Sequence, residues 1–314
     1  MIGLRGPVLA ATFVFGVTAA GAWAPSLLAG ARQQTPTFAA GVESVYVDAF
    51  VTRDGRPLSG LAAANFELED NGERQAVELV AVESLPVTTL LVFDTSGSVE
   101  GDKLRALRSA SERFVAGLRR EDEIGLIAFS HEVRFLARPS PDRASLRRAL
   151  EGMLASGGTA LWDALYTALA VLETRARIVV VLFTDGEDNM SFLGPRQVKT
   201  VAERSNALVQ VVGFKAPPVL GRRGHVVEPP EPEHLRLLRE TAEATGGRVW
   251  DAGSPDRLGT AFAAIMAAMN TRYVLRYEPL RVPRSGWHRI EVRLRGQKGD
   301  VHARRGYWRA PPQP

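Results

Sequence analysis

The 314-residue sequence contains no cysteine. This absence excludes disulfide bonds, thiolate metal sites, cysteine nucleophiles and a bacterial lipoprotein anchor, and it fits an exported protein that folds without oxidation. Lysine is scarce too, because it supplies only 4 of the 39 basic residues, which indicates a general bias toward arginine. Residues 272–309 are basic, with 11 Arg and Lys against 3 Asp and Glu, but they alternate like solvated strands. We therefore expect no nucleic-acid partner.

Several sequence motifs of enzymes are also missing. The chain has no phosphate-binding loop, no dinucleotide-binding glycine pattern and no Gly-x-Ser-x-Gly elbow. A serine hydrolase with Ser96 or Ser98 as nucleophile is the remaining enzymatic alternative. No histidine falls in the loop around Asp185, where the base of such an enzyme is expected. We expect that the protein is not an enzyme.

The first 31 residues have the pattern of an export signal. Arg5 gives a positive start, and no charged residue follows until Arg32. The small residues Ala29-Gly30-Ala31 offer a cleavage site. Because the apolar stretch is also long enough to span a bilayer, a retained membrane anchor is the alternative. We expect an exported protein, periplasmic or extracellular, that either loses this segment or associates with the envelope through it.

From residue 86 to residue 271, strand patterns alternate with helix patterns. Six strands are expected, at residues 87–93, 123–129, 133–139, 176–183, 208–214 and 248–252, and three of them are long apolar runs typical of strands buried on both faces. Helical patterns lie between them. Strands joined by crossover helices predict an α/β fold: a doubly wound, mostly parallel six-stranded sheet with helices on both faces.

Strand patterns occur at both ends of the chain as well. Residues 40–85 contain alternating strands and two hairpin-type turns, Asp54-Gly55 and Asn71-Gly72. Residues 272–310 return to strands with one apolar face. Since isolated hairpins are marginal in water, we expect the two segments to pack together as one small β-domain.

Oxygen-bearing side chains follow three of the predicted strand ends. Asp94, Ser96 and Ser98 come after the first strand of the sheet, Thr159 follows two glycines before a helix, and Asp185 comes after a later strand. Such loops meet at one edge of a doubly wound sheet. Carboxylates and hydroxyls suit a small hard cation such as Mg²⁺, although Mn²⁺ or Ca²⁺ can also occupy an all-oxygen site. The alternative is that Asp94, Ser98 or Thr159 caps a helix.

The set Asp94-x-Ser96-x-Ser98, Thr159 and Asp185 resembles the metal-ion-dependent adhesion site of von Willebrand factor type A (VWA) domains. The resemblance covers about residues 86–271, and the flanking β segments are similar to those of a secreted bacterial subfamily. It implies that the hydroxyls of Ser96, Ser98 and Thr159 bind Mg²⁺ directly or switch to doing so, while Asp94 and Asp185 act largely through water.

The resemblance implies a protein-binding or adhesion module whose metal is completed by a Glu or Asp of a partner protein. The alternative is a structural subunit of a cell-envelope complex, in which the metal only fixes a loop. A hydrolase is the least favoured reading.

Other polar residues give weaker signals. His225, Glu228 and His234 offer zinc ligands, but their proline-rich context is more typical of an exposed loop near the metal, suited to partner specificity. Asp163 either supports the metal shell or favours the dipole of its helix. Ser130 and His131 could contact a ligand near the site, but we expect a surface role for them.

Overall fold

The computed structural model describes residues 44–54, 56–81, 86–171, 177–186, 188–213, 219–220, 226–227 and 231–311. The chain divides into two units, Met1–Gly41 and Val42–Pro314, and all described residues belong to the second. The predicted export signal lies outside the described residues. In the described part of the chain, no helix is long and apolar enough to cross a membrane.

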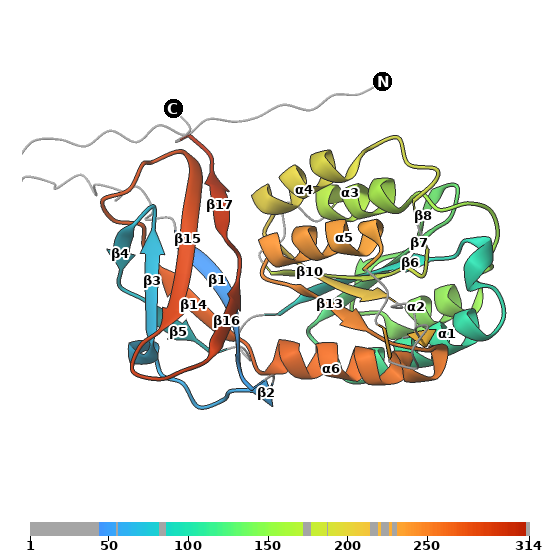
Figure 1. Ribbon diagram of the computed structural model, residues 1–314, viewed down its shortest axis with the longest axis horizontal. Coiled ribbons are helices and arrows are strands. Elements are labelled where there is room, and N and C mark those ends of the chain that lie inside the picture. The colour runs from blue at the N-terminus through green and yellow to red at the C-terminus, as the bar shows by residue number, and fades with distance from the viewer. Residues whose placement is uncertain are drawn as a thin grey trace, which may run out of the picture. The chain divides into compact units, whose positions relative to one another are not determined.

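A six-stranded sheet forms the centre of the α/β part, in the order β13-β10-β9-β6-β7-β8 (Figure 1). All neighbouring strands are parallel except β7 and β8, which are antiparallel. The strands are β6 (Thr88–Asp94), β7 (Glu123–Phe129), β8 (Val133–Ser140), β9 (Ile178–Phe183), β10 (Ala207–Gly213) and β13 (Arg248–Asp251). The mostly parallel sheet agrees with the predicted fold class, and β8 is the edge strand that its short sequence pattern suggested.

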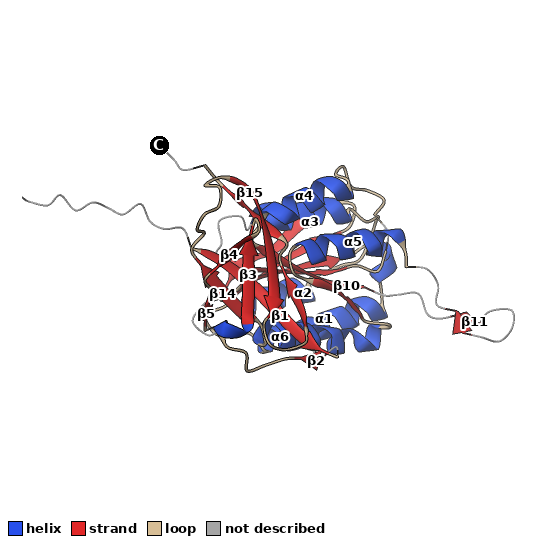
Figure 2. Ribbon diagram, turned by 60° about the vertical axis from the view of Figure 1, so that its left-hand side comes forward, coloured by secondary structure: helices blue, strands red, loops and turns tan. Residues whose placement is uncertain are grey.

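Helices cover both faces of this sheet, as Figures 1 and 2 show. Side chains alternate along β6, so Leu91 and Phe93 pack on one face while Leu90 and Val92 pack on the other. The first face is covered by α1 (Asp102–Ala116), α2 (Arg143–Glu151) and α6 (Leu258–Asn270). The second is covered by α3 (Leu161–Val171), α4 (Pro195–Arg204) and α5 (Glu233–Ala244).

The strands at the two ends of the chain pair with one another in two further sheets. One sheet has the order β16-β1-β14-β5, with β2 beside β1, and the other has the order β17-β15-β3-β4. Their strands are β1 (Val45–Arg53), β2 (Arg56–Pro57), β3 (Phe66–Asp70), β4 (Glu73–Gln75), β5 (Glu78–Val80), β14 (Tyr273–Tyr277), β15 (Gly286–Leu294), β16 (Asp300–Ala303) and β17 (Gly306–Arg309). The two sheets share one apolar core, which includes Val47, Leu68, Leu275 and Ile290.

The hairpin at Asn71-Gly72 is followed by a change from one terminal sheet to the other. Asn71-Gly72 forms the predicted turn, with positive φ at both residues, and joins β3 to β4. The chain then changes sheets between β4 and β5, because β5 pairs with β14 in the other sheet.

The segment predicted as a loop after β10 contains a short antiparallel pair, β11 (Val219–Leu220) and β12 (Val226–Val227). Since Val42–Pro314 is one compact unit, domain boundaries at residues 85/86 and 271/272 stay a prediction.

Candidate metal site

Asp94 ends β6 at the carboxyl edge of the sheet, and its side chain is fully buried. One carboxylate oxygen accepts a hydrogen bond from the Ser96 backbone N–H at 2.8 Å, and the other accepts one from Thr184 Oγ1 at 2.8 Å. Burial raises the pKa of the Asp94 carboxyl above its ordinary value, and these hydrogen bonds offset part of the rise. A nearby cation would therefore stabilise the ionised form of Asp94.

A chain of hydroxyl contacts connects the loop after β6 to the loop after β9. Ser96 Oγ lies 3.0 Å from Ser98 Oγ, and Ser98 Oγ donates to Asp185 Oδ1 at 2.8 Å. The Asp185 side chain is only 1% exposed, whereas Ser98 is exposed. Four of the five predicted residues therefore form one hydrogen-bonded group.

Thr159 reaches this group through its backbone neighbours. Gly97 N–H donates to the Gly157 carbonyl at 3.0 Å, and Ser156 N–H donates to the Thr95 carbonyl at 2.8 Å. The Thr159 side chain is buried. Among the described residues, no hydrogen bond joins its hydroxyl to the other four side chains. The structure thus brings the Thr159 loop to the site by main-chain contacts.

A glycine is required two residues before Thr159. Gly157 has φ +79°, a conformation that L side chains rarely adopt, and a Cβ atom there would lie 2.3 Å from His131 Nδ1. His131 is exposed, as predicted, and its Nδ1 lies 3.3 Å from Ser130 Oγ. Ser130 itself is buried, contrary to the surface role expected for it, and its carbonyl accepts from Ala160 N–H at 2.7 Å. Ser130 thus holds the residue that follows Thr159, and His131 leaves room only for a glycine at position 157.

The capping alternative is wrong for these residues. Helix α1 begins after Gly101 with no side-chain cap, so neither Asp94 nor Ser98 caps it. The first N–H groups of α3 are taken by residues that sequence reasoning missed. Asp188 Oδ1 accepts from Leu161 N–H at 2.8 Å, and Ser191 Oγ accepts from the two N–H groups that follow, at 3.0 and 3.2 Å.

Asp163, in α3, accepts hydrogen bonds from the loop after β9. Its two carboxylate oxygens accept from Phe192 N–H and Leu193 N–H, each at 2.9 Å. In the same loop, Asn189 Oδ1 accepts from Thr159 N–H at 2.8 Å. Asp163 thus positions a loop, a role that neither alternative for it anticipated. The run of Asp, Asn and Ser within residues 185–191 is the signal that could have identified these hydrogen bonds between α3 and the loop after β9.

Lys103, in the first turn of α1, was also missed. Its Nζ donates to the Ser98 carbonyl at 3.0 Å and forms an ion pair with Asp185 Oδ2. An ammonium group therefore lies against a predicted metal ligand. Of the residues considered for zinc, His234 is in the first turn of α5, while His225 and Glu228 lie outside the described residues.

The donor chemistry of the site fits a hard cation, since every side chain that meets there, apart from Lys103, offers oxygen. Among the described residues there is no group of three or more His, Cys, Asp and Glu that could hold a metal ion. Any metal here would thus depend on the hydroxyls as well as on Asp94 and Asp185.

Residues 89–187, which include all five predicted ligands, match the profile of the von Willebrand factor type A domain. The solved von Willebrand factor type A structure from Catenulispora acidiphila matches 82% of this chain and 76% of its own, with 16% identity and a TM-score of 0.50. The central sheet and its helices form a VWA-like domain. This confirms the predicted α/β fold.

Two relatives share sequence with part of this chain. An uncharacterized protein of Synechocystis sp. is 32% identical over 139 residues, which are 41% of this chain and 32% of the relative. A UPF0353 protein of Mycobacterium marinum is 24% identical over 226 residues, 64% of each chain. The chain thus spans about a third and just under two thirds of the lengths of these relatives.

Proposed function

We propose that the VWA domain binds a partner protein through Mg²⁺ held by Ser96, Ser98, Thr159, Asp94 and Asp185. The observation that carries the proposal is the hydrogen-bonded chain from Asp94 through Ser96 and Ser98 to Asp185, which joins the ends of two strands. In the VWA resemblance the hydroxyls bind the metal directly and the carboxylates act largely through water. When bound, Mg²⁺ would supply an electrophilic centre for a Glu or Asp of the partner.

The surface around the site supports a protein partner. Phe192 is 98% exposed, and Met190 and Leu154 are also exposed. Met190 N–H donates to the Thr159 carbonyl, so this side chain belongs to the rim of the site. The backbone N–H of Phe192 is held by Asp163. A large apolar side chain on a fastened loop is suited to protein binding, because little conformational freedom is lost when it docks.

Titration calorimetry with Mg²⁺ and Mn²⁺ tests the metal. Wild-type protein should release or absorb heat that is lost in Asp94→Ala and strongly reduced in Ser98→Ala. The Ser98 variant matters because Ser98 is exposed, so its removal leaves the core intact. Equal heats from wild type and both variants would remove the metal from the proposal.

Partner binding is tested separately with an envelope extract. Proteins retained on the immobilised chain should be released by EDTA and restored by Mg²⁺, and Phe192→Ser should weaken their retention. A partner retained equally in EDTA favours the second function, a structural subunit in which the metal only fixes a loop.

We propose binding rather than catalysis for this site. Within the described residues, the hydroxyls of Ser96 and Ser98 are hydrogen-bonded to each other, that of Ser98 donates to Asp185, and no hydrogen bond connects either to a histidine. The pairing of a serine with a histidine base, which activates many serine nucleophiles, is therefore not seen at these hydroxyls. Export to the periplasm or beyond, with loss or retention of residues 1–31, stays a prediction, and fractionation of tagged protein would test it.

A further inference from the structure

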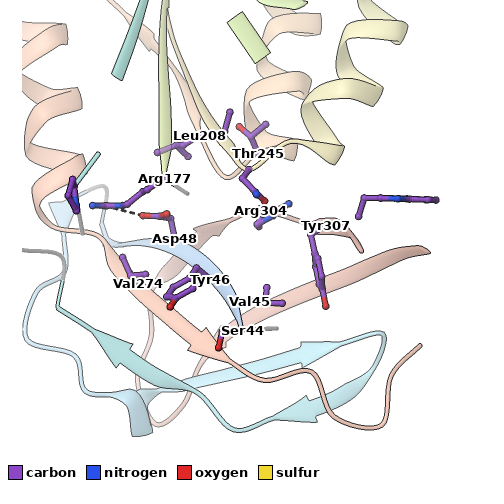
Figure 3. Close-up of a pocket in the computed structure, with 14 residues that line it drawn as sticks. Ser44, Val45, Tyr46, Asp48, Arg177, Leu208, Thr245, Val274, Arg304 and Tyr307 are labelled. Atoms are coloured by element: carbon purple, nitrogen blue, oxygen red, sulfur yellow. Dashed lines mark hydrogen bonds and ion pairs between the residues drawn. The ribbon is translucent and has the colours of Figure 1, made fainter. Parts of the chain in front are cut away.

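A cavity of about 320 Å³ lies at the end of the central sheet opposite the candidate metal site. Arg177 and Ala207 line it just where β9 and β10 begin, whereas the metal residues follow the carboxyl ends of the strands. Its other wall comes from the strands of the terminal sheets, including Tyr46, Asp48 and Tyr307. Figure 3 shows Arg177, Asp48 and Arg304 between these two layers.

Arg304 lines the cavity without a carboxylate partner. Its guanidinium donates to the Gly306 carbonyl at 2.7 Å, to Asn206 Oδ1 at 2.9 Å and to the Ser205 carbonyl at 3.1 Å, all of which are neutral acceptors. The one carboxylate among the described lining residues is Asp48, and it is paired with Arg177 at 3.2 Å. Among the described residues, no acidic side chain forms an ion pair with Arg304.

A second uncompensated arginine lies nearby. Arg272 is 4% exposed and donates to the Gly246 carbonyl, but its Nε and Nη1 have no hydrogen-bond partner among the described residues. It is close enough to Asp48 and Arg177 to interact with both electrostatically. Burial lowers the pKa of Arg272 and of Arg304 to about 10, so both remain charged at neutral pH. The single carboxylate of Asp48 thus interacts with three guanidinium groups, those of Arg177, Arg272 and Arg304.

We propose that this cavity binds a small amphipathic carboxylate, whose head pairs with Arg304 and whose apolar body packs against Tyr46, Tyr307 and Trp308. Poorly hydrated cations without a counter-ion are costly, and an anion removes that cost. A planar guanidinium with unused N–H groups suits a carboxylate in particular. The volume is at the lower end of the range for small-molecule sites. The cavity is independent of the metal and of the partner proposed above.

A matched pair of probes tests the charge requirement. 3-Phenylpropionate and its neutral amide have nearly the same shape, and each is titrated into the full chain in EDTA-containing buffer by calorimetry. The carboxylate should bind at least about tenfold more tightly than the amide. Arg304→Met should remove that preference, while Arg293→Met, a control at an exposed arginine of β15 paired with Glu291, should leave it unchanged.

Two results would overturn the proposal: equal binding of acid and amide to the wild-type protein, or no binding of the acid at millimolar concentration. Retention of the preference in folded Arg304→Met would do the same. Because Arg304 also holds two backbone carbonyls, Tyr46→Ala serves as a second variant at an exposed wall residue. It should keep its circular dichroism spectrum and weaken binding of the acid at least about threefold; unchanged affinity contradicts the proposed packing.

Discussion

Replacing Lys103 by methionine should increase the affinity of the candidate site for Mg²⁺. The Lys103 ammonium contacts Asp185 Oδ2 and the Ser98 carbonyl, so a metal that uses these residues must compete with it. Lys103 is 34% exposed and Asp185 1% exposed, so solvent screens the pair only in part. Loss of a partly exposed ion pair and of the repulsion between ammonium and metal is worth about 1–2 kcal/mol. This corresponds to roughly 5- to 30-fold tighter binding.

Calorimetric titration of Mg²⁺ at fixed ionic strength measures the effect. Lys103→Arg retains the charge and should bind Mg²⁺ no more tightly than wild type. Lys199→Met is the matched control, because this lysine forms a surface pair with Glu240 on neighbouring helices of the other face. Unchanged or weaker Mg²⁺ binding by Lys103→Met would refute the competition between ammonium and metal, since the only charge removed is the one beside Asp185.

Three further variants test the burial and packing described above. Asp94→Asn should stabilise the metal-free protein against urea unfolding at neutral pH. Burial raises the pKa of Asp94 above 3.8, so the wild-type protein loses stability as the pH rises through the folded pKa and this carboxyl ionises. The advantage of the variant over wild type should therefore vanish near pH 3.8. Asp70→Ala should lower the free energy of unfolding by about 3–5 kcal/mol, because this buried carboxylate accepts from Tyr277, Tyr307 and His288, whereas Glu69→Ala, at a partly exposed carboxylate of the same strand, should change it by less than about 0.5 kcal/mol. Gly157→Ala should weaken Mg²⁺ binding in calorimetry by displacing the Thr159 loop, and a second change, His131→Ala, should restore only part of it because the positive φ remains. Full Mg²⁺ affinity in Gly157→Ala would show that this loop does not help form the site.

The central sheet could be predicted from the sequence because its strands are long apolar runs separated by periodic helices. β6, β9 and β10 are buried along their whole length, and such strands have a clear pattern. The change of sheet between β4 and β5 could not be predicted, since strands of three residues are too short to carry a periodic signal.

The residues of the site were predicted by the rule that loops at the carboxyl ends of parallel strands meet. That rule places Asp94 and Asp185 at one edge, but it says nothing of how far a side chain reaches. Lys103 contacts Asp185 from 82 residues away in the sequence, and Asn189 holds the backbone of Thr159 across 30 residues. These contacts depend on side-chain conformation within loops, for which a single sequence carries no pattern.

The pairing of β5 with β14 has a mechanical consequence. The VWA-like domain leaves the terminal sheets after β5 and returns to them at β14, so it is attached by two chain crossings that arise on adjacent strands. A pull on the metal face would reach the ladder of β1, β14 and β5 through both crossings and through direct contacts such as the Arg177–Asp48 ion pair. A domain attached in this way resists twisting as well as stretching, in contrast to one that hangs from a single linker.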